Sequence, residues 1–373
     1  MSRSLMMIAG EISGDMHAAK LVAELNQEMP GVEIWGIGGD RMRAQGVETL
    51  VDIADMAVLG VSEVLKRYGF FRRVFRDMIA AVEARKPDAV ILVDYPGFNL
   101  RFARQMHRRG IKVIYYICPQ VWAWKRGRIA RMAEYLDRLL VIFPFEVAVF
   151  KGTGLVTDYV GHPLVEDVAA ALAAPRSELP WPAETRLALL PGSRIQEVER
   201  ILPLMLETLR RLRVTQPGIG AIIAASSVDT ARRIQALVGD AEGVNCVTGQ
   251  TREILIQANA ALVASGTATL ETALLGCPMV VVYKTAPLTY AVAKRVVKIP
   301  HIGMVNIIAG RELCPEFIQG AARPENIIPT LEPLLGDSGA RAEMIAGLRV
   351  IFDTLAHKGE KSAGELVAES VEG

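Results

Sequence analysis

The feature that most constrains the fold is a repeated alternation between short apolar runs and longer helical patterns. The runs are apolar at consecutive positions, which is typical of strands buried on both faces of a parallel sheet. Strands that alternate with helices at this spacing predict βαβ units. The strands that we expect are Leu5–Ala9, Glu33–Ile37, Ala89–Val93, Lys112–Ile117, Arg138–Ile142, Leu187–Leu190, Ile219–Ala224, Val244–Val247, Ala260–Val263 and Met279–Tyr283.

Helical patterns fill the intervals between these runs. The helices that we expect are Asp15–Glu28, Ser62–Arg85, Phe98–Arg109, Gln196–Arg213, Asp229–Val238, Thr251–Ala258, Thr267–Leu275 and Pro287–Lys298, with a helical C-terminal stretch from Pro324. The alternation pauses between Asp158 and Arg186, where Pro175, Pro180 and Pro182 follow an alanine-rich stretch. This pause predicts a linker, because the 373 residues also exceed the usual size of one domain.

The sequence therefore predicts an α/β protein with two Rossmann-like parallel-sheet domains that face a cleft. We expect the first domain at residues 1–165, a linker at 166–185, the second domain at 186–345 and a C-terminal helix within 346–373. Open α/β sheets bind their ligands beyond the carboxyl ends of the strands. We therefore expect the functional residues in the turns that follow the strands.

Composition excludes several classes of protein. Apolar residues make up 51% and charged residues 22% of the chain, which is a globular composition. The apolar runs are shorter than the roughly 18 residues that would span a bilayer, and the N-terminal run is too short for a signal peptide. The four cysteines lie far apart, so neither a disulfide framework nor a zinc knuckle is expected, and a reducing cytosol fits.

The charge distribution is more informative than the net charge of +1. Between Leu65 and Arg131 there are 16 Lys and Arg residues against 4 Asp and Glu residues. Such a region attracts nucleic acid, a phosphorylated substrate or a membrane surface. Its aromatic and cationic residues suit a helix on an anionic membrane, although a solvated helix with a core stripe is a competing interpretation. They include Phe70, Phe71, Arg72, Arg73 and Arg76.

A second part of this region contains Trp122 and Trp124 just before three cations. One interpretation is a rim that meets phosphate and apolar chains. The other is that the tryptophans only pack inside the protein, as tryptophans usually do.

The turn after the strand Ala260–Val263 predicts a phosphate site. Ser265, Gly266 and Thr267 open a helix, and the free N–H groups of a helix N-terminus favour anions. Glu271 lies one helical turn further, where a carboxylate can accept hydrogen bonds from sugar hydroxyls. A phosphate cradle beside a carboxylate indicates a nucleotide sugar, whereas the alternative is that Ser265 or Thr267 is only a helix cap.

Asp94 lies at the carboxyl end of the strand Ala89–Val93. A carboxyl there, near apolar surroundings, can have a raised pKa and act as a general base. The alternative is that Asp94 caps the helix expected from Phe98, which the intervening Pro96 makes awkward.

Two further turns follow the first strand of each domain. In the second domain, Gly192 and Ser193 give access to the backbone, and Arg194 can bind a diphosphate bidentately and neutralise its charge as it leaves. In the first domain, Ser13 and Gly14 belong to a turn that allows close backbone approach. Each turn also has a purely structural interpretation.

Asn306 is a lone amide in a mostly apolar loop, which turn formation explains as well as ligand contact does. Several other sites are not expected: the sequence has no metal-ligand spacing, no G-x-S-x-G, no P-loop lysine and no Asp-x-Asp. A bound diphosphate would then be held by Arg194 and helix N-termini, without a metal or a cofactor.

Together, these motifs resemble the lipid-A-disaccharide synthase family, glycosyltransferase family 19, from the first strand to about Gln319. The residues that carry the resemblance are Gly10-Glu11-x-Ser13-Gly14-Asp15, Asp94-x-Pro96-x-Phe98-Asn99, Pro119-x-Val121-Trp122-Ala123-Trp124, Leu189-Leu190-Pro191-Gly192-Ser193-Arg194, Ala264-Ser265-Gly266-Thr267-Ala268-Thr269-Leu270-Glu271 and Asn306-x-x-Ala309-Gly310-Arg311-Glu312.

The resemblance implies an inverting, metal-independent glycosyltransferase of the GT-B type. It implies that UDP-2,3-diacylglucosamine donates its sugar to 2,3-diacylglucosamine 1-phosphate, giving the disaccharide 1-phosphate and UDP. By position, Asp94 matches the family's proposed base, and Arg194, Glu271 and Asn306 match its UDP-binding region. Gly97 stands where some relatives carry a second acidic residue, so a two-carboxylate mechanism at this loop is not expected.

The acylated substrates imply a cytoplasmic enzyme that is peripheral on the anionic inner face of the inner membrane, with Trp122 and Trp124 beside the acceptor. The C-terminal helix either packs back on the first domain or is exchanged in a homodimer. An enzyme like UDP-N-acetylglucosamine 2-epimerase is the alternative of the same architecture. A protein that only binds anionic lipid or RNA is a weaker one, since it leaves the nucleotide cradle without a purpose, and no nucleic-acid partner is expected.

Overall fold

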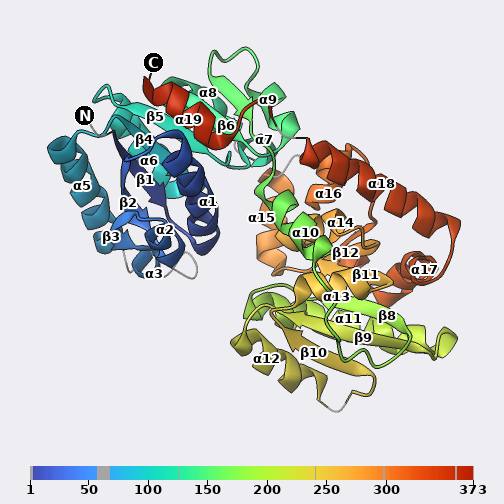
Figure 1. Cartoon of the computed structure of the whole chain (residues 1–373). Coiled ribbons are helices and arrows are strands. Elements are labelled where there is room, and N and C mark those ends of the chain that lie inside the picture. Colours follow the sequence, from blue (N-terminus) through green and yellow to red (C-terminus); the bar gives the residue numbers. More distant parts are fainter. Residues whose placement is uncertain are drawn as a thin grey trace. The chain divides into compact units, whose positions relative to one another are not determined.

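The computed structural model describes residues 3–56, 68–124, 126–239, 241–296, 299–357 and 359–372. The chain forms two compact units (Figure 1). The first unit comprises Met1–Pro163 together with His357–Gly373, and the second comprises Leu164–Ala356. Each unit is an α/β layer structure around one parallel sheet, so the predicted fold class is confirmed.

The sheet of the first unit has the strand order β3-β2-β1-β4-β5-β6-β7, and all neighbours are parallel. Its strands are β1 (Ser4–Ala9), β2 (Glu33–Gly38), β3 (Glu48–Asp52), β4 (Ala89–Val93), β5 (Lys112–Tyr116), β6 (Arg138–Val141) and β7 (Val156–Tyr159). Every residue of β4 is buried, as expected of a central strand covered on both faces.

The helices of the first unit are α1 (Ile12–Glu28), α2 (Asp40–Ala44), α3 (Ile53–Met56), α5 (Tyr68–Arg85), α6 (Pro96–His107), α7 (Val121–Trp124), α8 (Arg128–Tyr135), α9 (Pro144–Phe150) and α19 (Ala363–Glu372). In α5, Val74, Met78 and Val82 are buried. Their spacing of four residues places them on one face of the helix, which leaves the arginines of α5 on the exposed face.

The sheet of the second unit has the order β10-β9-β8-β11-β12-β13, again parallel throughout. Its strands are β8 (Thr185–Leu190), β9 (Ile219–Ala225), β10 (Val244–Thr248), β11 (Ala260–Ala264), β12 (Met279–Tyr283) and β13 (Glu316–Ile318). Its helices are α10 (Pro163–Ala173, whose first residue belongs to the first unit), α11 (Ile195–Thr215), α12 (Val228–Val238), α13 (Thr251–Gln257), α14 (Thr267–Leu274), α15 (Pro287–Val296), α16 (Met304–Ala309), a 3-10 turn (Gln319–Ala321), α17 (Pro324–Leu335) and α18 (Gly339–Ala356).

The strand order places the functional turns. In both sheets the order reverses beside the first strand, between β1 and β4 in one unit and between β8 and β11 in the other. Parallel α/β sheets open a crevice for ligands at the carboxyl ends of the two strands that flank such a reversal. The turns that follow these four strands, together with the first residues of the next helices, contain Gly10–Gly14, Asp94, Pro191–Arg194 and Ser265–Thr267.

The structure departs from the sequence-based expectations in several elements. The interval expected to be a linker contains the helix α10, in keeping with its alanine-rich sequence. The C-terminal stretch divides: α18 packs against α14, α16 and α17 of the second unit, whereas α19 packs against α1 of the first (Figure 1). The first residues of the helix expected at Ser62–Arg85 lie outside the described residues. No helix in the described ranges is long and apolar enough to cross a bilayer.

Candidate active site

Asp94 lies in a strained turn directly after β4. Its φ angle is 45° and that of Tyr95 is 47°, so both residues adopt the left-handed conformation. The Asp94 N–H donates to the Tyr116 carbonyl at 3.1 Å. The Asp94 carbonyl accepts from the Asn99 amide at 2.8 Å and from the Tyr115 hydroxyl. Buried side chains of β5 and α6 therefore hold the turn in place.

Helix α6 begins at Pro96 with Tyr95 as its N-cap, and not near Phe98 as the sequence analysis expected. Proline is favoured at the first position of a helix, where its missing N–H costs nothing. Asp94 therefore lies one residue outside the capping position.

Gly10 connects the turn after β1 with the turn that contains Asp94. A Cβ atom on Gly10 would lie 2.3 Å from Cδ1 of Tyr95, so the tyrosine ring rests on the glycine backbone. The register pairs Ala9 with Val93, which brings the two turns side by side. Only glycine allows this close approach.

The surroundings of Asp94 favour its neutral form. Burial is the main cause and the charge of Glu11 adds to it, and together they raise the pKa of Asp94 to about 6. A hydrogen bond from the Tyr95 N–H acts in the opposite direction. A carboxyl group with a pKa of about 6 is mostly ionised at neutral pH and still basic enough to accept a proton efficiently.

Ser13, Gly14 and Asp15 lie in the first turn of α1, which begins at Ile12, and they differ in role. Ser13 is exposed, whereas Gly14 is buried near Ala9. Asp15 is also buried, and its carboxylate accepts from the N–H groups of Gly39, Arg41 and Met42 at 2.7, 3.1 and 3.2 Å. Asp15 thus satisfies the N-terminal N–H groups of α2, a structural role that the sequence analysis did not identify.

The expectation that Trp122 forms part of a membrane or acceptor rim is wrong. Trp122 is only 6% exposed, and its indole N–H donates to Glu146 Oε1 at 3.0 Å. The ring also packs edge-on against Phe145. Trp122 is therefore a packing residue, as the alternative interpretation held, and the side chain of Trp124 lies outside the described residues.

An aromatic pocket of about 440 Å³ lies beside the Asp94 turn, between α5 and α6. Its lining residues are Tyr68, Phe71, Arg72, Phe75, Tyr95, Gly97, Phe98 and Arg101. The floor is rigid because Phe75 packs edge-on against Phe98 and Phe102, with ring centroids 5.2 and 5.6 Å away. The pocket has the size and apolar character typical of a small-molecule site.

Some of the residues of α5 that the sequence predicts at a membrane line this pocket, and others face solvent. Phe70 and Phe71 are half-buried, and their rings pack edge-on 5.6 Å apart. Arg72, Arg73 and Arg76 are exposed, and Arg76 pairs with Asp77.

Further arginines lie on or directly after α6 and on α8. Helix α8 packs on α6, which contacts α5 through its phenylalanines. Several arginines on these three helices form no ion pair with any described residue. We call this set the basic surface: Arg72, Arg73, Arg101, Arg104, Arg108, Arg128 and Arg131.

In the second unit, the register pairs Leu190 with Val263, so the turns after β8 and β11 lie side by side. Gly192 has a φ angle of 111°, and a Cβ there would lie 2.6 Å from Glu197 Oε2. Glycine is therefore required, and the neighbouring Ser193 is exposed.

The guanidinium of Arg194 is well exposed and bonds Glu197 at 2.9 Å, within the first turn of α11. A surface ion pair of this kind is worth at most about 1 kcal/mol. Arg194 can therefore exchange Glu197 for a diphosphate at little cost.

The turn after β11 leaves a helix N-terminus accessible. Gly266 is the N-cap of α14, and both Gly266 and Thr267 are exposed. The Ser265 hydroxyl donates to the Ile302 carbonyl at 3.3 Å, which ties the turn to the segment before α16. The Thr269 N–H donates to the Gly266 carbonyl at 3.1 Å, whereas the N–H groups of Thr267 and Ala268 at the start of α14 can receive an anion.

Glu271 lies in the second turn of α14, where its side chain is 20% exposed. Its Oε1 atom accepts from Nε of Arg252 at 2.7 Å. Arg252 was not identified from the sequence, because it lies 19 residues away on α13.

The Asn306 side chain is hydrogen-bonded within the protein. It is fully buried, and its amide donates to the Cys314 carbonyl and to Glu316, both at 2.7 Å. Its oxygen accepts the N–H groups of Leu313 and Cys314, both at 2.8 Å. Glu316 also binds the N–H group of Ile302, so Asn306 acts on the site by holding the segment that Ser265 contacts.

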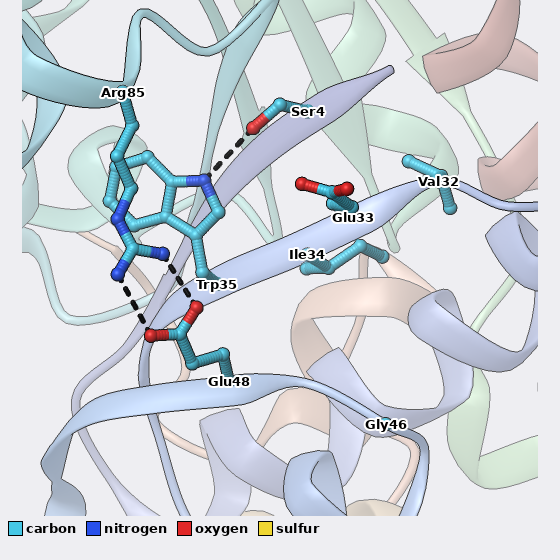
Figure 2. A pocket seen from close by; sticks show the side chains of 8 residues that line it. All are labelled: Ser4, Val32, Glu33, Ile34, Trp35, Gly46, Glu48 and Arg85. Carbon is cyan, nitrogen blue, oxygen red and sulfur yellow. Dashed lines mark hydrogen bonds and ion pairs between the residues drawn. The ribbon is translucent and has the colours of Figure 1, made fainter. Parts of the chain in front are cut away.

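Another pocket lies at the amino ends of β1, β2 and β3 in the sheet of the first unit (Figure 2). There, Arg85 lies over the Trp35 ring at 4.9 Å and forms two hydrogen bonds with Glu48. The Trp35 indole donates to Ser4 Oγ at 3.0 Å. These groups already satisfy one another, so this pocket is part of the packing. In the part of the chain that the structure describes, no cluster of three or more His, Cys, Asp or Glu side chains could hold a metal ion.

Two parallel-sheet α/β units of this kind form the fold that GT-B glycosyltransferases and UDP-N-acetylglucosamine 2-epimerases share. A UDP-N-acetylglucosamine 2-epimerase from Neisseria meningitidis, solved with UDP-N-acetylglucosamine, matches with a TM-score of 0.59 at 13% identity over 100% of both chains. The calicheamicin glycosyltransferase CalG4 matches with a TM-score of 0.59 at 15% identity, over 100% of this chain and 98% of the other. At these identities the likeness concerns the fold alone.

Sequence comparison is more specific. The family model of lipid-A-disaccharide synthetase matches residues 5–371. A lipid-A-disaccharide synthase from Anaeromyxobacter sp. (strain K) is 43% identical, over 99% of this chain and 97% of the relative. One from Geobacter sulfurreducens is 40% identical over 97% and 96%. The chain belongs to the lipid-A-disaccharide synthase family and is a glycosyltransferase of lipid A biosynthesis.

Proposed function

We propose that the protein joins UDP-2,3-diacylglucosamine to 2,3-diacylglucosamine 1-phosphate, with Asp94 as the general base. Asp94 takes the proton from the 6-hydroxyl of the acceptor as that oxygen attacks C1 of the donor. UDP leaves from the opposite face, which inverts the anomeric centre. The observation that carries this assignment is the half-buried carboxyl of Asp94, whose pKa of about 6 suits proton transfer near neutral pH.

The second unit would bind the UDP part of the donor. The N-terminus of α14 carries roughly half a positive charge. Together with Arg194 it would stabilise the departing diphosphate. Glu271 lies four residues after Thr267, on the same helix face, and would accept a hydrogen bond from the ribose. Because these groups supply the positive charge themselves, we propose that transfer is independent of metal ions.

The aromatic pocket would hold an acyl chain of the acceptor. It shares Tyr95 with the Asp94 turn, so a chain in this pocket belongs to the sugar on which Asp94 acts. Burial of a methylene group contributes about 0.8 kcal/mol. Arg72 and Arg101 line the same pocket and can meet the phosphate of the acceptor.

The basic surface would hold the enzyme on the cytoplasmic face of the inner membrane, where its acylated substrates reside. Each arginine near an anionic membrane contributes about 1 kcal/mol. Replacement of Phe70, Phe71, Arg72, Arg73 and Arg76 should weaken sedimentation with anionic vesicles, whereas replacement of the exposed Arg210 and Arg232 of the second unit should not. Unchanged binding of the first variant would remove α5 from the proposal. A homodimer with exchanged C-terminal helices stays a prediction from the family resemblance.

A turnover assay tests the reaction. With both acylated substrates and a chelator, we expect release of UDP and formation of the disaccharide 1-phosphate. Replacement of Arg194 by Ala should raise the KM for the donor more than the KM for the acceptor. Conversion of UDP-N-acetylglucosamine to its 2-epimer, without transfer between acylated sugars, would instead support the epimerase alternative. Loss of turnover with the chelator would contradict metal independence.

A further inference from the structure

Three charged side chains from different helices of the second unit meet at Arg252. Its Nε donates to Glu271 Oε1 at 2.7 Å, and its Nη2 lies 3.5 Å from Asp167 Oδ2. Arg252 belongs to α13, Glu271 to α14 and Asp167 to α10. The three side chains are partly buried, with exposed fractions between 20% and 37%.

This contact differs from the exposed ion pairs within α11 and at its N-cap. Arg194 with Glu197 and Arg210 with Glu207 are pairs within one helix, each with a well-exposed arginine. Exposed pairs of this kind contribute little to stability. Arg252 instead joins three helices, one of which is the helix that follows the boundary between the two units.

The geometry leaves half of the Glu271 carboxylate available. Arg252 occupies Oε1, and no other hydrogen bond to the Glu271 side chain is found among the described residues. The guanidinium is planar and its donors are fixed in direction, so it sets the orientation of the whole carboxylate. Asp167 restrains the guanidinium from the other side. The free Oε2 atom is therefore held in one direction before any ligand binds.

We propose that Arg252 is a positioning residue for nucleotide binding: it orients Glu271 so that the free carboxylate oxygen accepts a ribose hydroxyl. The inference rests on the proposed role of Glu271 in the donor site. Asp167 supports the same arrangement by restraining Arg252.

The expected effect follows from the cost of ordering a side chain. Glutamate has three side-chain torsions, and immobilising such a side chain on binding costs about 0.5–1.5 kcal/mol. Arg252 removes this cost in advance. Its loss should weaken binding of UDP about two- to tenfold. A nucleotide without ribose hydroxyls cannot use Glu271, so its binding should not change.

The test compares UDP with 2′,3′-dideoxyuridine 5′-diphosphate by calorimetry on the full-length protein. For the wild type we expect tighter binding of UDP. Arg252→Gln should lower this preference by raising the Kd of UDP alone, and Asp167→Asn should act in the same direction more weakly. Glu271→Gln should lower the preference as well. Arg233→Gln is the matched control, because Arg233 pairs with Glu199 on the surface of α11 and α12.

A merely structural role would weaken both nucleotides equally, and that result in Arg252→Gln would overturn the inference. An unchanged preference for UDP in Arg252→Gln would also overturn the inference. If Glu271→Gln nevertheless lost this preference, the proposed role of Glu271 would remain intact. Equal binding of the two nucleotides by the wild type would refute the role of Glu271 itself. If Arg252→Gln does not fold, Arg252→Lys replaces it in the test. Lysine keeps the positive charge but lacks the planar guanidinium with its fixed donors, so this variant should also lower the preference for UDP.

Discussion

Replacement of Asp94 by Asn should make the protein more stable at pH 7 while it removes the catalytic base. In the folded protein burial, aided by Glu11, raises the pKa of Asp94 from 3.8 to about 6. The ionised carboxylate is therefore disfavoured in the native state at neutral pH. This difference in pKa corresponds to about 3 kcal/mol. Asn has a similar shape, no charge, and tolerates the left-handed backbone at this position.

The gain in stability of Asp94→Asn must depend on pH, and the raised pKa of Asp94 fixes the direction of this dependence. Between about pH 4 and pH 6 the folded state binds the Asp94 proton and the unfolded state has lost it. The contribution of Asp94 to stability therefore falls as the pH rises through this window. The Asp94→Asn variant should exceed the wild type by up to about 3 kcal/mol at pH 7 and by less than about 1 kcal/mol at pH 4.

Urea unfolding at the two pH values measures this difference. Asp77→Asn is the matched control, because Asp77 is an exposed carboxylate that pairs with the neighbouring exposed Arg76. The control should change stability little at either pH. If Asp94→Asn is no more stable than the wild type at pH 7, or if its gain is the same at pH 4, the argument that Asp94 is held in a disfavoured charged state is refuted.

Three further outcomes are expected. Glu11→Gln should move the acid limb of the kcat/KM profile to lower pH, because the charge of Glu11 helps to raise the pKa of Asp94; an unmoved limb would contradict this coupling. Gly10→Ala should lower turnover and cost about 1–3 kcal/mol in urea unfolding, since the new methyl group would push the Tyr95 ring away; unchanged kinetics would show that the contact does not matter. Asn306→Ala should destabilise the protein by at least about 2 kcal/mol, because two buried N–H groups lose their acceptor, and a smaller loss in thermal or urea unfolding would argue against its structural role.

The parallel sheets could be predicted from sequence because their central strands are continuous apolar runs. The strands β3, β7 and β13 could not, since they are short, lie at or near the sheet edges and carry polar residues. Their identity depends on pairing with a neighbour, which no local pattern records. The helix α10 was missed for a related reason: nearby prolines suggested a linker, although they follow the helix.

The candidate site, too, could be predicted only in part from the sequence. The turns that contain Asp94 and Arg194 could be located because each follows an apolar strand. Contacts between residues that are distant in sequence could not be predicted: Arg252 lies 19 residues before Glu271, and Asp15 caps a helix 24 or more residues away. Trp122 was misplaced because a tryptophan beside cations has the same local pattern whether it is buried or exposed.

The most direct test of the account measures transfer and UDP binding together in Asp94→Asn. Single-turnover transfer between the two acylated sugars should fall by about 10²–10⁴-fold, as expected for loss of a general base. The Kd of UDP, measured by calorimetry on the same preparation, should not change, because the nucleotide is assigned to the second unit. Near-normal transfer by the folded variant, or a parallel loss of UDP binding, would contradict the account.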